Sequence, residues 1–293
     1  MPYPSTFSIV ACDLKINAWG IAVASKFPAV GSVVPWAQVG AGAIATQAAA
    51  NTSFGPRGLE MLTIGTSAEE TLGRLLANDP ERENRQVGIV DKHGGSASYS
   101  GKSCNDWAGG ANGPGYAIQG NILVSDQVVP AMQKAFQETD GELPERLYAA
   151  LFAGDKAGGD RRGRQSAAIY VVKPQGGYGG FIDRWIDYRV DDHFDPVTRL
   201  GDLLQLHRLY FGKSPESERL VLSGKVLSRL QEIMKQTSYY HGPALGQMDE
   251  TTRIALNAFM GNENFEERCN VLAGWIDSPV FDFLVEKFGN HND

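Results

Sequence analysis

The sequence predicts an α+β fold in which β-sheets are stacked between layers of helix. Three observations favour it: short strands recur through the first hundred residues between Gly and Pro, two or more helices come next, and two further strands follow. Strands first, then helices, then strands again favour stacked sheets over a strict βαβ repeat. Hydrophobic residues make up 42% of the chain and charged residues 21%, which is ordinary for a globular protein.

The predicted strands are short apolar or alternating runs bounded by Gly, Asn, Asp or Lys. In the first part of the chain they cover residues 6–12, 19–25, 30–37, 42–48, 86–91 and 95–100. Later, Ala167-Ala-Ile-Tyr-Val-Val172 predicts a further strand. A glycine-rich turn separates it from an edge strand near Trp185–Val190.

The predicted helices carry apolar residues at helical spacing. Ser67, with Glu70 three residues later, has the pattern of a capping box and so predicts a helix start. An amphipathic helix over 195–210 has Pro196 at its first position. Others are predicted at about 126–138, capped by Ser125, and at about 143–156.

A polar segment from Phe211 to Ser217 interrupts this pattern and predicts a domain boundary. The predicted domains are residues 1–213 and residues 218–293. The second is expected to be a small all-α domain of two or three short helices. From residue 214 onward there are 7 basic and 12 acidic residues, so most of the net charge of −7 lies in the tail.

Composition excludes several classes of function. A net charge of −7 argues against a nucleic-acid partner, because binding phosphates needs a concentrated basic surface. No window approaches the roughly 18 apolar residues of a membrane span, and the N-terminus lacks the features of a signal peptide. The three cysteines, Cys12, Cys104 and Cys269, lie far apart, which favours a reducing compartment. We therefore predict a soluble, cytoplasmic protein without a membrane partner.

Thr6 is the candidate nucleophile, at the start of the apolar strand Thr6-Phe-Ser-Ile-Val-Ala-Cys-Asp13. A threonine with a free α-amino group acts as nucleophile and general base together, because such an amine has a pKa of about 8. Five residues precede Thr6, so this chemistry requires their removal. The alternative is a β-branched residue that only begins a strand.

Several segments resemble one protein family. They are Thr6-Phe-Ser-Ile-Val-Ala11, Ala29-Val-Gly-Ser-Val-Val-Pro-Trp36, Ala45-Thr-Gln-Ala48, Phe54-Gly-Pro-Arg-Gly58 and Gly158-Gly-Asp-Arg-Arg-Gly-Arg-Gln-Ser-Ala167. Through them, residues 6 to about 212 resemble the bacterial and archaeal proteins of domain of unknown function 1028. The resemblance implies an N-terminal-nucleophile hydrolase with a four-layer αββα sandwich. The tail, from Tyr240 to Phe259, resembles a peptidoglycan-binding domain, which implies a peptidoglycan fragment as ligand.

The order of features also resembles a proteasome-type β-subunit, and this resemblance implies four catalytic residues: Thr6, Lys26, Asp160 and Ser166. Lys26 would lower the pKa of the neighbouring ammonium or hydroxyl; the alternative is a solvated lysine at a strand end. Asp160 would orient the amine of the nucleophile and Ser166 would relay a proton. They stand six residues apart rather than three, unlike the Asp-x-x-Ser turn of those subunits.

Six further residues are candidates for binding substrate. Thr46, Gln47 and Ala48 end a predicted strand, where backbone N–H groups would hold an oxyanion, although small residues there also serve sheet packing. Arg161 or Arg164 would anchor a substrate carboxylate, or else the charges of this glycine-rich loop pair with one another. Asn121 would bind substrate or satisfy a turn.

Two rival sites are weaker. Cys104 is a candidate nucleophile without an adjacent histidine. The segment Asp191-Asp-His193 with Asp195 has the residue types of a metal site, but Asp195 is better placed to cap the next helix. We predict neither a metal nor a cofactor.

Together, these features predict an amide-bond hydrolase that uses Thr6 on a small amide, lactam or peptide-like substrate. The alternative is a non-catalytic binding or scaffold protein, whose tail binds cell-wall fragments or partner subunits. We expect a homodimer, because stacked-sheet hydrolases of this type commonly associate.

Overall fold

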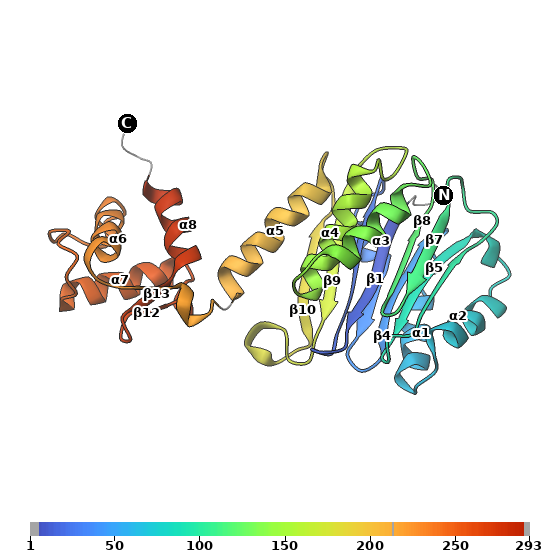
Figure 1. The fold of residues 1–293 in the computed structure, drawn as a ribbon, viewed down its shortest axis with the longest axis horizontal. Helices are drawn as coiled ribbons and strands as arrows, with labels where there is room; N and C mark the ends of the chain where they lie inside the picture. The colour runs from blue at the N-terminus through green and yellow to red at the C-terminus, as the bar shows by residue number, and fades with distance from the viewer. Residues whose placement is uncertain (1–5, 213, 290–293) are drawn as a thin grey trace. The chain divides into compact units, whose positions relative to one another are not determined.

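The computed structural model describes residues 6–212 and 214–289 of the 293-residue chain (Figure 1). The chain divides into two compact units, of which the first ends at Leu203 and the second begins at Leu204. The division falls inside helix α5 (Pro196–Phe211), which has the predicted proline at its first position.

The first unit contains two antiparallel sheets. One has six strands in the order β10-β9-β2-β1-β8-β7, and the other has four in the order β3-β4-β5-β6. The strands are β1 (Thr6–Asp13), β2 (Ala18–Ser25), β3 (Pro35–Gln38), β4 (Gly42–Ala48), β5 (Arg85–Asp91), β6 (Ser96–Ser100), β7 (Gly109–Gly113), β8 (Tyr116–Gly120), β9 (Ser166–Val172) and β10 (Arg184–Val190). Side chains of both sheets, such as Val23 and Ala45, share one buried core, so the sheets pack face to face.

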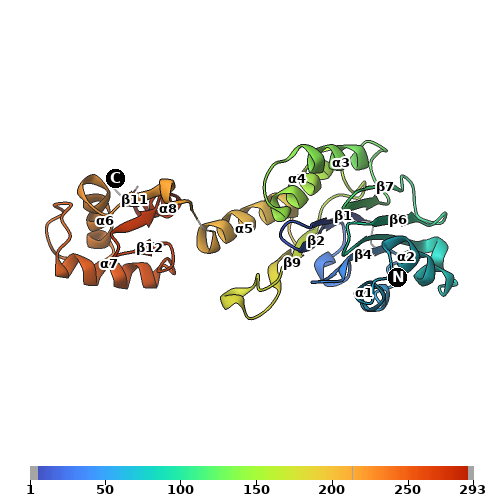
Figure 2. The ribbon, with the colours of Figure 1, turned by 60° about the horizontal axis from the view of Figure 1, so that its bottom comes forward.

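Helices cover the outer face of each sheet (Figures 1 and 2). Helices α1 (Phe54–Thr63) and α2 (Ala68–Ala77) pack on the four-stranded sheet, where Phe54 and Leu75 meet Ile44 of β4. Helices α3 (Val128–Glu138) and α4 (Leu143–Lys156) lie over the six-stranded sheet, with α4 against β1 and β2. The predicted mixed fold of helices and stacked sheets is therefore confirmed.

Most predicted elements lie where the sequence placed them, and the predicted cap of α2 is present, because Ser67 Oγ accepts from Glu70 N at 3.2 Å. The strand predicted over 30–37 is wrong in its first half. The chain there forms a 3₁₀ turn, η1 (Val30–Ser32), after Ala29 with a left-handed φ of 50°, and β3 begins only at Pro35. Strands β7 and β8 were not predicted, because β7 is largely glycine and gives no apolar alternation.

The second unit is mainly helical, as predicted, with α6 (Gly224–Gln236), α7 (Glu250–Asn262) and α8 (Ser278–Gly289) around a core that includes Leu230 and Phe259. The expectation of an all-α domain is corrected by a small sheet of β11 (Arg219–Val221), β12 (Cys269–Asn270) and β13 (Trp275–Asp277). Strands of two or three residues are too short for an alternating pattern to reveal. The 3₁₀ turn η4 (Glu216–Glu218) also belongs to this unit, whereas η2 (Arg82–Asn84) and η3 (Tyr178–Gly180) belong to the first. Within residues 6–212 and 214–289, no helix has the length and apolar character needed to span a membrane.

Candidate active site

Three hydroxyl side chains form a row at one end of the six-stranded sheet. Thr6, the first residue of β1, is opposite Ser25 at the end of β2, and Ser25 is opposite Ser166 at the start of β9. Residues an even number of positions away on these strands, such as Val10 and Val23, belong to the core between the sheets. Side chains alternate along a strand, so the three hydroxyls lie on the face turned toward the four-stranded sheet. Thr6 Oγ1 donates to Ser25 Oγ at 3.3 Å.

Ser166 is bonded to the chain that leaves β2. Its Oγ donates to the carbonyl of Phe27 at 2.5 Å and accepts from Val30 N at 3.1 Å. The Ser166 hydroxyl therefore holds the backbone of residues 27–30, just after Ser25, in place.

Asp160 ties the glycine-rich loop of residues 158–166 to the same place. Its side chain is 2% exposed and accepts from Lys26 N at 2.8 Å, while Arg162 forms an ion pair with it at 3.0 Å. Lys26 itself is exposed, and its Nζ donates to the carbonyl of Arg164 at 3.3 Å. Among the hydrogen bonds of the described residues, none joins Lys26 Nζ to Thr6, so an effect of its charge on the nucleophile stays a prediction.

Two predicted substrate-binding residues contact Thr6 through its carbonyl group. The Thr6 oxygen accepts from Asn121 N at 3.0 Å and from Gln47 Nε2 at 3.2 Å. Both side chains are buried. Segments around residues 6, 47 and 121, far apart in the sequence, therefore meet at the start of β1.

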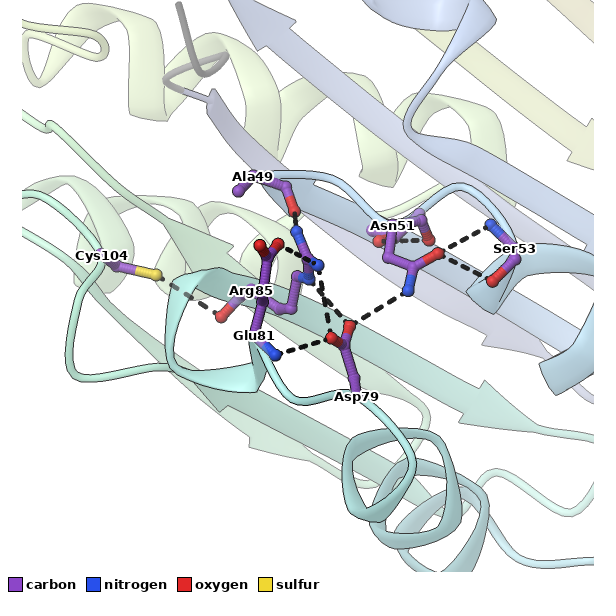
Figure 3. Close-up of polar contacts among 8 residues, drawn as sticks. Ala49, Asn51, Ser53, Asp79, Glu81, Arg85 and Cys104 are labelled. Carbon is purple, nitrogen blue, oxygen red and sulfur yellow. Dashed lines mark hydrogen bonds and ion pairs between the residues drawn. The ribbon is translucent and has the colours of Figure 1, made fainter. Parts of the chain in front are cut away.

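The loop between β4 and α1 is braced by a polar cluster (Figure 3). Arg85 donates to the carbonyl of Ala49 at 2.6 Å and pairs with Asp79 at 2.8 Å. Asn51 Nδ2 donates to the same carboxylate at 3.0 Å. Hydrogen bonds from Arg85 are the main reason that the pKa of Asp79 is lowered to about 2. At the head of this loop, Ala48 has a left-handed φ of 63°, a conformation that costs energy for a residue with a side chain.

The amides of the predicted oxyanion segment differ in their surroundings. Thr46 N donates to the carbonyl of Val34 at 3.2 Å, so it already serves the sheet. Ala49 N donates to Asn84 O in the neighbouring connection to β5. Because amides alternate in direction along an antiparallel pair, the amide of Ala48 is directed away from β5.

The arginines of the 158–166 loop do different things. Arg164 donates two hydrogen bonds, of 2.7 and 2.9 Å, to the Asp155 carboxylate, and Arg162 forms an ion pair with Asp160. The pair of Arg162 and Asp160 lies within the loop, whereas Arg164 pairs with a residue of α4. Arg161 is exposed, and its backbone N donates to Ile122 O.

A small cavity adjoins the row of hydroxyls. It measures about 10 Å³, and its walls include Ser25, Asp160, Arg164 and Ser166. A volume of this size holds about one water molecule. Thr6 is 0% exposed and is not among the residues that line this cavity. Residues 1–5, whose removal the threonine chemistry requires, lie outside the described residues.

The two rival sites gain no support from the geometry. Cys104 Sγ donates to the carbonyl of Arg85 at 3.4 Å, and burial raises its pKa. His193 Nδ1 accepts from Asp195 N at 3.0 Å. Within residues 6–212 and 214–289, no three His, Cys, Asp or Glu side chains gather as metal ligands would.

The sequence analysis missed three polar residues next to this end of the sheets: Ser8, Gln86 and Gln119. All are fully buried between the two sheets. The side chains of Ser8 and Gln86 bond Gln47, and the side chain of Gln119 donates to Ser8. The available signal was a polar residue at an inward position of an otherwise apolar strand, as at Ser8 between Phe7 and Ile9.

Comparison with known proteins identifies the two parts of the chain. Residues 210–284 match the family model described as "Putative peptidoglycan binding domain". The crystal structure of protein SPO2555 from Silicibacter pomeroyi is similar to this chain, with a TM-score of 0.64 and 31% sequence identity, covering 70% of this chain and 89% of that one. A search of curated proteins found no match. The model of the family of unknown function DUF1028, which also describes SPO2555, matches residues 6–200, and the chain belongs to this family.

Proposed function

We propose that this protein is an amide-bond hydrolase whose nucleophile is Thr6 after removal of residues 1–5. The observation that carries the proposal is the convergence of Thr6, Ser25, Ser166 and Asp160 at one end of two stacked sheets. With helices on both outer faces, we assign this unit to the four-layer αββα class of N-terminal-nucleophile hydrolases. In that class, the first residue of a central strand supplies both nucleophile and base.

The proposed reaction proceeds in two steps. Thr6 Oγ1 attacks the carbonyl carbon of a substrate amide while its proton passes to the freed α-amine. The amine then protonates the departing nitrogen as the C–N bond breaks, which leaves an ester on Thr6. Water activated by the same amine hydrolyses the ester and regenerates the hydroxyl.

The remaining candidates have supporting roles in this proposal. The amide of Ala48, directed away from β5, would stabilise the oxyanion of the tetrahedral intermediate. Ser25 would bond the nucleophile and relay its proton, Ser166 would hold the backbone that leaves β2, and Asp160 would hold the end of β2 in place. Arg161, rather than the engaged Arg164, would bind a substrate carboxylate.

The test begins with the N-terminus of the working protein. Intact-mass measurement of active material should give a chain that starts at Thr6, and only that species should react with a peptide epoxyketone, which captures a hydroxyl and its neighbouring amine together. Thr6→Ser should keep the reaction and Thr6→Ala should abolish it. A chain intact from Met1 or Pro2 that hydrolyses a panel of small amides, lactams and dipeptides at full rate would overturn the proposal.

The match of residues 210–284 favours a second activity, binding of a peptidoglycan fragment by the C-terminal unit. The full chain should sediment with insoluble peptidoglycan and not with cellulose, and deletion of residues 210–293 should abolish this. Sedimentation that survives the deletion would refute the assignment. We also predict a homodimer and a cytoplasmic location; light scattering on the purified full chain and cell fractionation test them.

A further inference from the structure

Five polar side chains cross the space between the two sheets beside Thr6. Gln47 and Gln86 come from the four-stranded sheet, Ser8 and Gln119 from the six-stranded sheet, and Asn121 from the end of β8. Gln86, Gln47, Gln119 and Ser8 are 0% exposed. We call these five residues the amide network.

Gln86 is the centre of the amide network. Its Oε1 accepts from Gln47 Nε2 and from Asn121 Nδ2, both at 2.8 Å. Its Nε2 donates at 2.7 Å to the hydroxyl of Ser100 and, at the same distance, to the carbonyl of Gly120. One side chain thereby joins β4, β5 and β6 to the end of β8.

Ser8 closes the network from β1. Its hydroxyl donates to Gln47 Oε1 at 2.6 Å and accepts from Gln119 Nε2 at 2.5 Å. Gly88 of β5 leaves room for this arrangement, because a Cβ at that position would lie 2.0 Å from Gln119 Oε1.

Such a network is a poor way to stabilise a core. Burying amides in place of apolar side chains gives little net stability even when their hydrogen bonds are made, and here Gln119 Oε1 is buried without a hydrogen-bond partner among the described residues. Hydrogen bonds between the other members nevertheless fix how those side chains are arranged. The rest of the core that the two sheets share consists mostly of Val and Ala side chains. The network therefore contributes geometry more than stability.

The amide network holds the backbone of Thr6 in place. Gln47 Nε2 bonds Gln86 and also the carbonyl of Thr6, and the backbone N of Asn121 bonds the same carbonyl. The side-chain amides of Gln47 and Asn121 both donate to Gln86 Oε1, and Gln47 is also bonded to Ser8 and to the carbonyl of Gln119. Gln86 therefore acts on Thr6 through two neighbours, the side chains of Gln47 and Asn121, each of which donates to the Thr6 carbonyl.

We propose that the amide network, with Gln86 at its centre, positions Thr6 at the end of β1 for its reaction. This rests on the proposed function for the reaction itself, but the placement of Thr6 is a separate property. Gln47 and Asn121 are positioning residues that hold the nucleophile by its carbonyl, in contrast to the substrate-binding roles predicted from the sequence.

The test compares three variants of the full chain that starts at Thr6. Gln86→Met keeps the side-chain length but removes the shared acceptor. Gln86→Glu restores the acceptor and, when protonated, one donor. Asp91→Asn is the matched control, because Asp91 is a buried hydrogen-bonding centre at the opposite end of β5 that binds Ala68 N, His93 N and Gly95 N.

Two readouts are taken for each variant. The first is the rate of capture by a peptide epoxyketone, and the second is the methyl NMR signal of Thr6, assigned with Thr6→Ser. We expect Gln86→Met to slow capture about 10- to 100-fold, as misplacement of a reacting group does, and to shift or broaden the Thr6 signal. Asp91→Asn should change neither. For Gln86→Glu, the rate relative to the unsubstituted protein should fall as pH rises, because ionisation of the buried carboxyl removes its donor.

The outcomes separate the two claims. A Thr6 signal that stays in place in Gln86→Met, with capture within twofold of the unsubstituted protein, overturns the positioning inference. Equal changes in Gln86→Met and Asp91→Asn also overturn it, since they indicate general destabilisation. If the unsubstituted chain is never captured but Gln86→Met still displaces the Thr6 signal, the positioning inference stands and the proposed function fails.

Discussion

Arg164 and Asp155 form a bidentate ion pair, in which Nε and Nη2 of the arginine lie 2.7 and 2.9 Å from the two carboxylate oxygens. This geometry uses the guanidinium face that a substrate carboxylate would need. Arg161, three residues earlier in the same loop, is exposed as well, but the guanidinium of Arg164 is the one engaged by Asp155.

Substitutions should separate the proposed substrate binding by Arg161 from the structural ion pair of Arg164. Arg161→Met should weaken inhibition by small carboxylic acids at least fivefold and leave the free energy of unfolding within about 0.5 kcal/mol, as is usual for a surface substitution. Arg164→Met should lower that free energy by about 1–3 kcal/mol, because it leaves the buried Asp155 carboxylate without its partner. Inhibition constants and urea unfolding test both, and a stronger loss of inhibition in Arg164→Met would reverse the assignment.

The pair of Asp79 and Arg85 predicts a dependence of stability on pH. The pKa of Asp79 is lowered from 3.8 to about 2, so its contribution is present above pH 4 and is lost as pH falls through 2. A shift of this size corresponds to about 2 kcal/mol. The stability difference between the unsubstituted protein and Asp79→Asn should therefore shrink by about that amount between pH 5 and pH 2.

Chemical unfolding at a series of pH values measures the Asp79 effect. Glu70→Gln is the control, since Glu70 makes an exposed ion pair with Arg74 on α2 and such pairs contribute about 0–1 kcal/mol. A constant difference between Asp79→Asn and the unsubstituted protein across this range would contradict the prediction.

Gly88 should resist substitution because of its place beside the amide network. Gly88→Ala puts a Cβ 2.0 Å from Gln119 Oε1, and overpacking of this kind costs about 1–3 kcal/mol. Gly73→Ala, at an exposed site of α2 where a Cβ meets nothing within 4 Å, should stabilise by about 0.5–1 kcal/mol. Thermal unfolding of the two variants should shift in opposite directions; a neutral Gly88→Ala would mean that Gln119 has room to move.

The cysteines should be unreactive in the folded protein. Burial raises the pKa of Cys12 to about 11 and of Cys269 to about 12, and it raises that of Cys104 as well. At pH 8 the thiolate, the reactive form, is therefore scarce at all three. Iodoacetamide should modify none of them rapidly before unfolding, and Cys104→Ala should keep full activity. Loss of activity in Cys104→Ala would make Cys104 the nucleophile instead of Thr6.

Arg268 should control the stability of the C-terminal unit. It forms a 2.6 Å ion pair with Asp277, both side chains being 5% exposed, and it donates to the carbonyls of Arg208 and Leu209. Arg268→Met leaves the buried Asp277 carboxylate with only the longer, 3.8 Å ion pair to Arg219 and should cost about 3 kcal/mol. Arg253→Met, which breaks an exposed pair with Glu250, should cost less than about 1 kcal/mol. Similar unfolding midpoints for the two would show that the buried pair is dispensable.

The sequence predicted the strands of the fold well because apolar alternation marks them, as in β1 and β9. It missed β7, whose glycines carry no such pattern, and the start of β3, where Pro35 and the left-handed Ala29 redirect the chain. The mixed architecture and the family were accessible from the motifs alone.

The candidate site was predictable in its members more than in their contacts. Motifs pointed to Thr6, Asp160 and Ser166, but Ser25 as the link between Thr6 and Ser166 follows only from strand register. Gln86 was missed because a buried glutamine and a solvent-facing one look alike in a strand. That Arg164 pairs with Asp155, nine residues earlier, depends on how α4 ends beside the loop.

The row Thr6–Ser25–Ser166 has a consequence for the newly made chain. Its members are separated by 19 and then 141 positions, so they come together only when β9 has joined the sheet. A slip of one residue in either pairing would turn a hydroxyl to the opposite side. An incomplete or misaligned polypeptide thus lacks the assembled row, and the proposed reaction becomes possible only after β9 has been synthesised and has paired with β2.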